Sequence, residues 1–86
     1  MLHDIPRAAL KDREPAFAAL NEALPEGLSA TNLDALFDVL TEVTDLTLRL
    51  TGPAPEGAFY PRVLRVLKDA EQEKPRFFLL EMPEQW

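Results

Sequence analysis

Prolines divide this chain into short segments and limit where its helices can begin and end. A proline is tolerated in the first turn of a helix, where its missing N–H would be unpaired anyway, but it stops a helix that runs into it. The sequence contains eight prolines in 86 residues. Pro15 and Pro25 bracket one alanine-rich segment, and Pro61 and Pro75 bracket a second apolar segment. The chain therefore predicts short helices joined by loops, within a single domain of residues 1–86.

Apolar residues recur at helical spacing inside both bracketed segments. Ala16–Leu24 predicts the first helix, with Asp12 as its N-cap. Val63–Ala70 predicts the last helix, opened by Pro61 and ended by Pro75.

A further helix is predicted between these two, over about Asn32–Glu42. Thr31 followed by Asp34 fits the pattern in which a hydroxyl and an acid three residues later satisfy the free N–H groups of a helix start. Apolar side chains return every three or four positions and so share one face of this helix. They are Leu33, Leu36, Leu40 and Val43.

Three segments have the features of strands. Leu46–Leu50 alternates apolar and polar residues, which is typical of a half-buried strand. Phe77–Leu80 is a short apolar run and predicts a strand covered on both faces. Leu2–Ile5 is a weaker candidate, since it holds a histidine and an aspartate. Because helical connections between strands require parallel pairing, we expect a small α/β domain with a three-stranded parallel sheet and about three helices.

The charge of the chain is unevenly distributed. The formal net charge is −6, from 15 Asp and Glu against 9 Lys and Arg, and this argues against general binding to nucleic acid or to an anionic membrane. No basic residue lies between Arg13 and Arg49, so the negative excess is local to that stretch. The acids in it are Glu14, Glu22, Glu26, Asp34, Asp38, Glu42 and Asp45.

The remaining sequence signals concern location. Met1–Ile5 lacks a basic region followed by an apolar one, so no signal peptide is visible. No apolar run approaches the roughly 20 residues that span a bilayer. The chain has no cysteine, which excludes disulfides and thiolate metal sites. We expect a monomeric, soluble, cytoplasmic protein that does not bind a membrane.

Few side chains suit catalysis. His3 is the only histidine and lies at the terminus, and Ser29 lacks the G-x-S-x-G setting of a nucleophile. Asp34 and Asp38 lie one helical turn apart, but two carboxylates on one exposed helix make a poor cage for a cation such as Mg²⁺. We therefore expect no enzyme activity, cofactor or metal, and keep a metal-dependent enzyme using these aspartates as a distant alternative.

The acidic stripe of the middle helix is the feature that most suggests a function. Asp34 and Asp38, and again Asp38 and Glu42, are like-charge pairs four residues apart, each destabilising by about 0.2–0.5 kcal/mol. Asp34 regains about 0.3–1 kcal/mol of helix stability because its negative charge interacts favourably with the helix dipole at the N-terminus. Asp38 and Glu42 lie too far from the N-terminus for this gain. The stripe is either a solvated face or a binding surface. The lack of any base within helical reach favours a surface for a cationic partner.

The residues Asn32–Thr41, NLDALFDVLT, resemble the signature helix of the barstar family, whose members are intracellular inhibitors of guanyl-specific, barnase-type ribonucleases. They match the family pattern except at Phe37, where the family has tryptophan. The resemblance extends more loosely over Leu24–Glu81, in which Val63–Ala70 is similar to the last helix of the family and Phe77–Leu80 to its last strand. It implies a three-stranded parallel sheet covered by helices.

The resemblance also implies a mechanism. Barstar-like inhibitors insert an acidic helix and its preceding loop into the ribonuclease active site, where their carboxylates take the positions of RNA phosphates. By position, Asp38 would be the deepest carboxylate, Asp34 would contact the edge of the cleft, and Asp69 would add a peripheral contact. The expected partner is a basic, extracellular-type ribonuclease. The other candidate contact residues are Asn32, Phe37, Thr41 and Glu42.

Most of these residues have a structural alternative. Asp34 could be a capping acid only, and Asp69, one turn after Arg65, could form a simple surface pair. Phe37 lies between the apolar and acidic faces, so it could be peripheral core or a contact aromatic. Asn32 is expected to hold the loop at the helix start whatever the partner is.

The sequence also departs from the family pattern. The loop Gly27–Thr31 is one residue longer than usual and lacks the aromatic residue of the family. After Thr41 stand Glu42 and Val43, where the family often has a small residue and tryptophan. The connection Thr51–Tyr60 is short, so one short helix of the family is expected to be missing. The alternative function is therefore a protein-interaction module of the same fold whose basic partner is not a nuclease.

Overall fold

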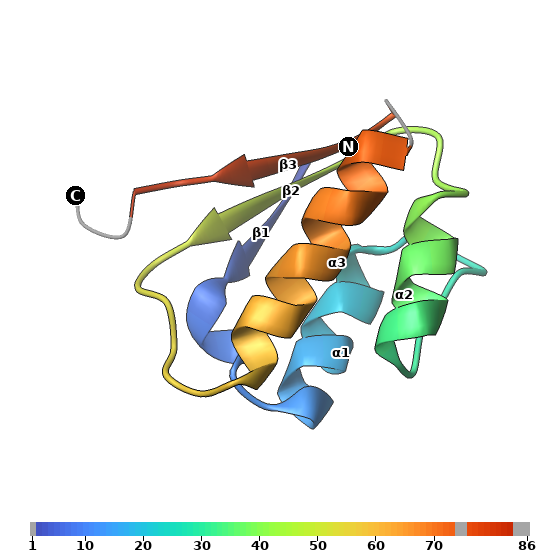
Figure 1. The fold of residues 1–86 in the computed structure, drawn as a ribbon. Helices are drawn as coiled ribbons and strands as arrows, with labels where there is room; N and C mark the ends of the chain where they lie inside the picture. Colours follow the sequence, from blue (N-terminus) through green and yellow to red (C-terminus); the bar gives the residue numbers. More distant parts are fainter. Residues whose placement is uncertain (1, 74–75, 84–86) are drawn as a thin grey trace.

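A three-stranded parallel sheet forms the back of the molecule in the computed structural model, which describes residues 2–73 and 76–83 (Figure 1). The strands are β1 (Leu2–Pro6), β2 (Leu46–Thr51) and β3 (Phe77–Glu81), in the spatial order β1-β2-β3. All three segments predicted as strands are confirmed, including the weak candidate at the N-terminus. The predicted α/β class with a parallel sheet is confirmed as well.

The described part of the chain adds three α-helices and one 3-10 turn, in keeping with the predicted number. They are η1 (Arg7–Leu10), α1 (Arg13–Ala23), α2 (Leu33–Leu40) and α3 (Phe59–Glu73). The α-helices lie together on one side of the sheet (Figure 1). Residues 52–58 connect β2 to α3 without a helix, as the short length of this connection predicted.

Two prolines lie inside the first turn of a helix rather than before it. α1 begins at Arg13, so Pro15 is its third residue, and α3 begins at Phe59, two residues before Pro61. Both helices therefore start two or three residues earlier than predicted, because the first turn accepts a residue without an N–H donor. Asp12 occupies the N-cap position of α1 as predicted, although its side chain makes no capping hydrogen bond.

The start of α2 differs from the predicted capping pattern. Asn32, not Thr31, is the N-cap, and its side-chain oxygen accepts a hydrogen bond from the Ala35 N–H at 2.7 Å. The prediction placed the cap one residue too early because the extended backbone belongs to Asn32, with φ −149° and ψ 172°. The helix ends at Leu40, and Thr41 is the C-cap, so α2 is shorter than the predicted span.

The hydrophobic core lies between the helices and the face of the sheet that they cover. The alternating leucines of β2, together with Leu36 and Leu40 of α2, are fully buried, as their periodicity predicted, whereas Leu33 in the first turn of α2 is half-buried. The largest fully buried side chains are Phe77, Ile5, Leu10, Leu20, Leu36, Leu40, Leu46, Leu48, Leu50, Leu67 and Val63.

The opposite face of the sheet is open. Leu2, Phe78 and Leu80 are 50%, 48% and 43% exposed, respectively. The prediction that the strand at 77–80 is covered on both faces is therefore wrong: the strand is at the sheet edge and the helices all lie on its other side. The outer edge of β3 is used by α3, since the Leu79 N–H donates to Glu71 Oε2 at 2.7 Å. That bond occupies a backbone donor which an edge strand would otherwise expose.

A buried arginine ties the ends of the three strands together. Arg7 follows β1 directly and is 4% exposed. Its guanidinium donates from Nη1 to the Gly52 carbonyl at 2.6 Å and from Nη2 to the Met82 carbonyl. Gly52 follows β2 and Met82 follows β3, so one side chain bridges all three strand ends. The sequence gives no sign of this role, because the partners lie 45 and 75 residues away.

Candidate functional site: the acidic face of helix α2

Two acids of the predicted stripe, Asp34 and Asp38, lie on the outside of α2, and the third, Glu42, follows the helix, two residues after its end. Asp34, Asp38 and Glu42 are all exposed, and we call these three residues the acidic face. On the other side of the same helix, Leu36 and Leu40 have no exposed surface. The helix is therefore anchored by its leucines against α3 and the core, and it holds the acidic face toward solvent.

The acidic face has no cation to neutralise it within the described chain. None of its three carboxylates forms an ion pair or a hydrogen bond with a residue that the structure describes. The like-charge pair Asp34–Asp38 within the helix therefore stands uncompensated, at about 0.2–0.5 kcal/mol, and Glu42 adds a third unpaired carboxylate just after the helix. A row of unpaired carboxylates on a well-anchored helix can accept hydrogen bonds from a cationic partner without first breaking internal bonds.

Three other predicted contact residues have structural roles around α2. Asn32 caps the N-terminus of the helix, and the Thr41 hydroxyl at the C-cap donates to the Asp38 carbonyl at 2.7 Å. Phe37 is half-buried and packs against the hydrophobic core, which is the peripheral-core alternative for this residue. These contacts stabilise the helix that carries the acidic face.

Asp69 belongs to α3 rather than to the acidic face. Its carboxylate Oδ2 lies 4.0 Å from Arg65 Nε, one turn earlier on the same helix, and its side chain is 58% exposed. No hydrogen bond or ion pair links it to α2 in the part of the chain that the structure describes. Its surface pair with Arg65 is thus formed, while its role in partner binding stays a prediction.

The loop before α2 is held by residues that the sequence analysis missed. Asn21 of α1 makes two hydrogen bonds with the backbone of Ala30, donating to its carbonyl at 3.0 Å and accepting from its N–H at 2.8 Å. Arg13 of α1 donates from Nη2 to the Thr31 carbonyl at 3.0 Å. Local periodicity carries no signal for these contacts, because the partners belong to different elements. Together they fix the path of the chain into α2.

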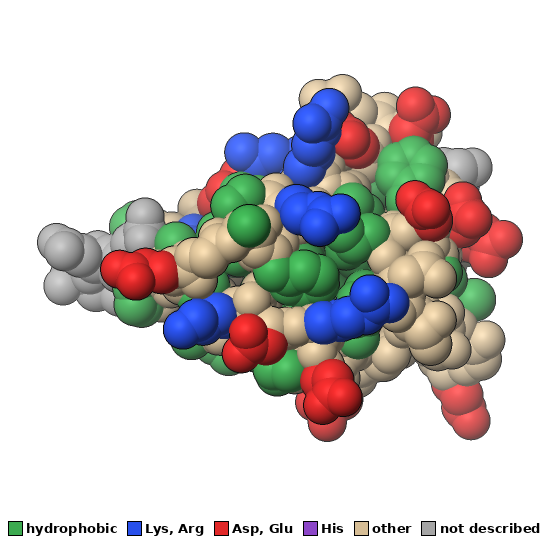
Figure 2. Space-filling model, turned by 60° about the horizontal axis from the view of Figure 1, so that its bottom comes forward, with side chains coloured by type: hydrophobic (Ala, Val, Ile, Leu, Met, Phe, Trp, Pro, Cys, Tyr) green, Lys and Arg blue, Asp and Glu red, His purple; other side chains and the backbone are tan. Residues whose placement is uncertain are grey.

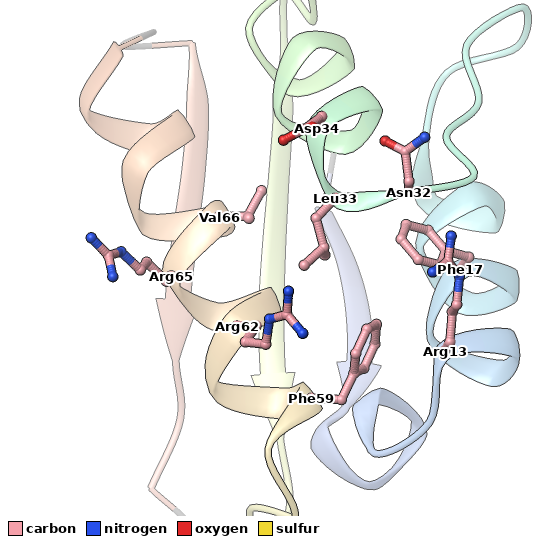
Figure 3. A pocket seen from close by; sticks show the side chains of 9 residues that line it. All are labelled: Arg13, Phe17, Asn32, Leu33, Asp34, Phe59, Arg62, Arg65 and Val66. Carbon is pink, nitrogen blue, oxygen red and sulfur yellow. The ribbon is translucent and has the colours of Figure 1, made fainter.

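A cavity of about 470 Å³ lies beside the N-terminus of α2, between α1 and α3. We call it the arginine hollow, because three of its nine lining side chains are arginines from two helices (Figure 3). Figure 2 shows basic side chains around an apolar area on one face of the molecule, with acidic side chains at several places around its rim. The lining residues are Arg13, Phe17, Asn32, Leu33, Asp34, Phe59, Arg62, Arg65 and Val66.

The described residues also bear on two other kinds of feature, metal-ligand clusters and membrane-spanning helices. Within 2–73 and 76–83, no three His, Cys, Asp or Glu side chains are grouped closely enough to hold a metal ion. Over the same ranges, no helix has both the length and the apolar character needed to cross a bilayer. The acidic face is thus a row of carboxylates and not a cage.

Comparisons of the chain with protein-family models, with curated proteins and with solved structures found no match. The resemblance to the barstar family therefore rests on the residues of Asn32–Thr41 and on the weaker similarity that follows them.

Proposed function

We propose that this protein inhibits a guanyl-specific, barnase-type ribonuclease by covering its basic active site with the acidic face of α2. The observation that carries the proposal is the state of that face: two exposed carboxylates on α2 and a third directly after it, all unpaired within the described chain. A cleft that binds RNA phosphates must be cationic, and a row of carboxylates complements it in charge.

The position of each acid on α2 suggests its part in binding. Asp38 lies in the middle of the exposed side, where a partner groove would exclude most water, and we assign it the central contact. Asp34 lies one turn earlier, at the edge of the contact. Desolvated charge pairs with good hydrogen bonds are frequent hot spots, and complementary charge accelerates association.

The helix is well prepared for such a contact. Asn32 and Thr41 cap its two ends, and the Asn21–Ala30 and Arg13–Thr31 hydrogen bonds hold the loop that precedes it. A surface that is already ordered loses less conformational entropy when a partner binds.

A second candidate function is a protein-interaction module whose basic partner is not a nuclease. The loop before α2 favours this alternative, since it presents no aromatic side chain. Leu28 is half-buried and packs against the core, which leaves Ser29 and Thr31 as exposed side chains of the loop. Such a loop cannot stack on a flat group in a nuclease cleft.

The test is a titration of a purified barnase-type ribonuclease, followed by its rate of RNA cleavage. The proposal expects stoichiometric inhibition at micromolar concentration that weakens as salt is raised. Asp38→Ala should weaken binding by about 2 kcal/mol or more, roughly 30-fold. Glu56→Ala, which removes another exposed acid from the 52–58 connection, should leave inhibition unchanged.

If the wild-type chain at about 10 micromolar does not slow RNA cleavage, the nuclease proposal is contradicted for this enzyme class. Tight, salt-sensitive binding with full RNA cleavage would instead support the interaction module. Equal losses in Asp38→Ala and Glu56→Ala would show that overall charge, and not the acidic face, governs binding.

A further inference from the structure

The arginine hollow is lined by more basic than acidic residues in a chain of net charge −6. Its lining includes three arginines and a single acid, Asp34. The hollow therefore carries an excess of positive charge directly beside the acidic face, and the proposed function makes no use of it.

The three arginines differ in how far they are already engaged. Arg13 donates to the Thr31 carbonyl and lies with its guanidinium carbon 5.9 Å from the centre of the Phe17 ring. Arg65 lies 4.0 Å from Asp69, and its guanidinium points away from the other lining side chains (Figure 3). Arg62 forms no ion pair or hydrogen bond with any residue that the structure describes, and it extends from α3 into the space facing Leu33 (Figure 3). Arg62 is thus the guanidinium available to a ligand.

The other walls of the hollow are apolar and include two aromatic rings. Phe17 and Phe59 pack edge to face, with their ring centres 6.4 Å apart and their planes at 66°. Phe59 is half-buried, so part of its ring borders the open space, where Leu33 and Val66 complete the wall. A flat apolar group placed here would contact a ring on one side and aliphatic carbons on the other.

We propose that the arginine hollow binds a small organic anion that carries a flat ring. Its phosphate or carboxylate group accepts hydrogen bonds from Arg62, and its ring packs against Phe59 and Leu33. The planar guanidinium matches both oxyanions in geometry and charge. The volume of about 470 Å³ lies within the range of roughly 300–1,000 Å³ typical of small-molecule sites.

Asp34 gives this proposal a distinctive signature. Its carboxylate is part of the same lining, and it repels any anion bound at Arg62. Removal of this charge should therefore strengthen anion binding. The same substitution removes a carboxylate from the acidic face and should weaken binding of a cationic protein partner. The two surfaces thus respond to one substitution with opposite signs.

The experiment titrates the full isotope-labelled chain with adenosine monophosphate, benzoate and inorganic phosphate, while backbone amide NMR signals are followed at constant ionic strength. A ringed anion should give saturable shifts centred on Leu33, Phe59 and Arg62, and inorganic phosphate should bind at least five times more weakly. Arg62→Gln should weaken binding at least tenfold. Asp34→Asn should tighten it about two- to fivefold.

The control is Arg76→Gln, which removes an exposed arginine that is not part of the hollow and should leave binding unchanged. Saturation by adenosine monophosphate alone supports a phosphate-bearing ligand, and saturation by benzoate alone supports an aromatic carboxylate. The proposal is overturned if no probe saturates at 10 millimolar, or if Arg62→Gln and Arg76→Gln weaken binding equally. Neither result depends on ribonuclease inhibition, so the two proposals fail separately.

Discussion

Two neighbouring regions of this protein carry opposite charge and are built in different ways. The acidic face takes its three carboxylates from α2 and the residues that follow it directly. The arginine hollow takes its three arginines from α1 and α3, and the regions share Asp34. A surface built along one helix appears as a period in the sequence, whereas a surface assembled from two helices appears only when the chain is folded.

The difference also bears on how a partner would recognise the molecule. Opposite charges side by side define a direction on the surface, so a charged partner is favoured in one orientation and disfavoured in the reverse. A uniformly acidic surface would define no such direction. The net charge of −6 therefore conceals the property most relevant to binding.

The largest expected effect breaks both regions together. Leu36 has no exposed surface and anchors α2 to the core. Leu36→Ala should lower the free energy of unfolding by about 3 kcal/mol through lost burial and a residual cavity, measured by urea denaturation. Val39→Ala, at a half-buried position of the same helix, should cost clearly less. Equal losses would mean that Leu36 is not the anchor.

A smaller loss of stability should follow from breaking the scaffold beneath both regions. Arg7→Met keeps an unbranched chain of similar length but removes the donors to the Gly52 and Met82 carbonyls. The expected loss is about 2 kcal/mol, since two carbonyls lose their partners. Thermal unfolding measures this loss. Arg7→Lys keeps one charged donor group and should have a stability between those of the wild type and the Met variant. A Met variant as stable as the wild type would show that the strand ends do not need this bridge.

Asn32 belongs to both regions, because it caps α2 and lines the arginine hollow. Asn32→Ala should cost about 1 kcal/mol of stability, the usual effect of losing an N-cap. Asn32→Asp retains an oxygen for the Ala35 N–H and should keep most of that stability. Chemical denaturation of both variants measures their free energies of unfolding. If Asn32→Asp is no more stable than Asn32→Ala, the capping role of Asn32 is wrong.

Asp38 should sharpen the contrast between stability and binding. Asp38→Asn removes the like-charge pair with Asp34 within α2, so the chain should gain about 0.2–0.5 kcal/mol of stability. The same change should weaken inhibition in the ribonuclease titration. Glu56→Gln, outside the face, should alter neither quantity. A loss of stability in the Asn variant would mean that Asp38 makes a stabilising contact within the fold.

The smallest effect belongs to a charge pair in neither region. On the open face of the sheet, Arg49 donates from Nε and Nη2 to the carboxylate of Asp4, and these hydrogen bonds lower the pKa of Asp4 below its usual 3.8. A lowered pKa stabilises the fold above pH 3.8, and this contribution is lost as the pH falls through the lowered value.

Both side chains of that pair are exposed, so the effect on stability is small. Asp4→Asn should leave the melting temperature nearly unchanged at pH 7 and make unfolding less acid-dependent below pH 3.8. Melting curves from pH 2 to 7 measure this. An unchanged acid profile in the Asn variant would show that the pair does not contribute.

Much of the architecture follows from local sequence, because its determinants are neighbours in the chain. The alternation of Leu46–Leu50, the helical spacing of the α2 leucines and the first-turn prolines specify the elements and their order. Strands joined through helices must pair in parallel, so the topology follows from that order. The acidic face is predictable for the same reason, since a helix converts a spacing of four residues into adjacency.

Only the tertiary structure decided which face of the sheet is covered and which charges meet. The apolar run Phe77–Leu80 is consistent with burial on both faces, yet the placement of all described helices on one side leaves Phe78 and Leu80 half exposed. Arg7 finds its carbonyl partners 45 and 75 residues away, and the arginine hollow joins α1 to α3. The physical reason is that periodicity records contacts within one element, whereas these features depend on how separate elements pack.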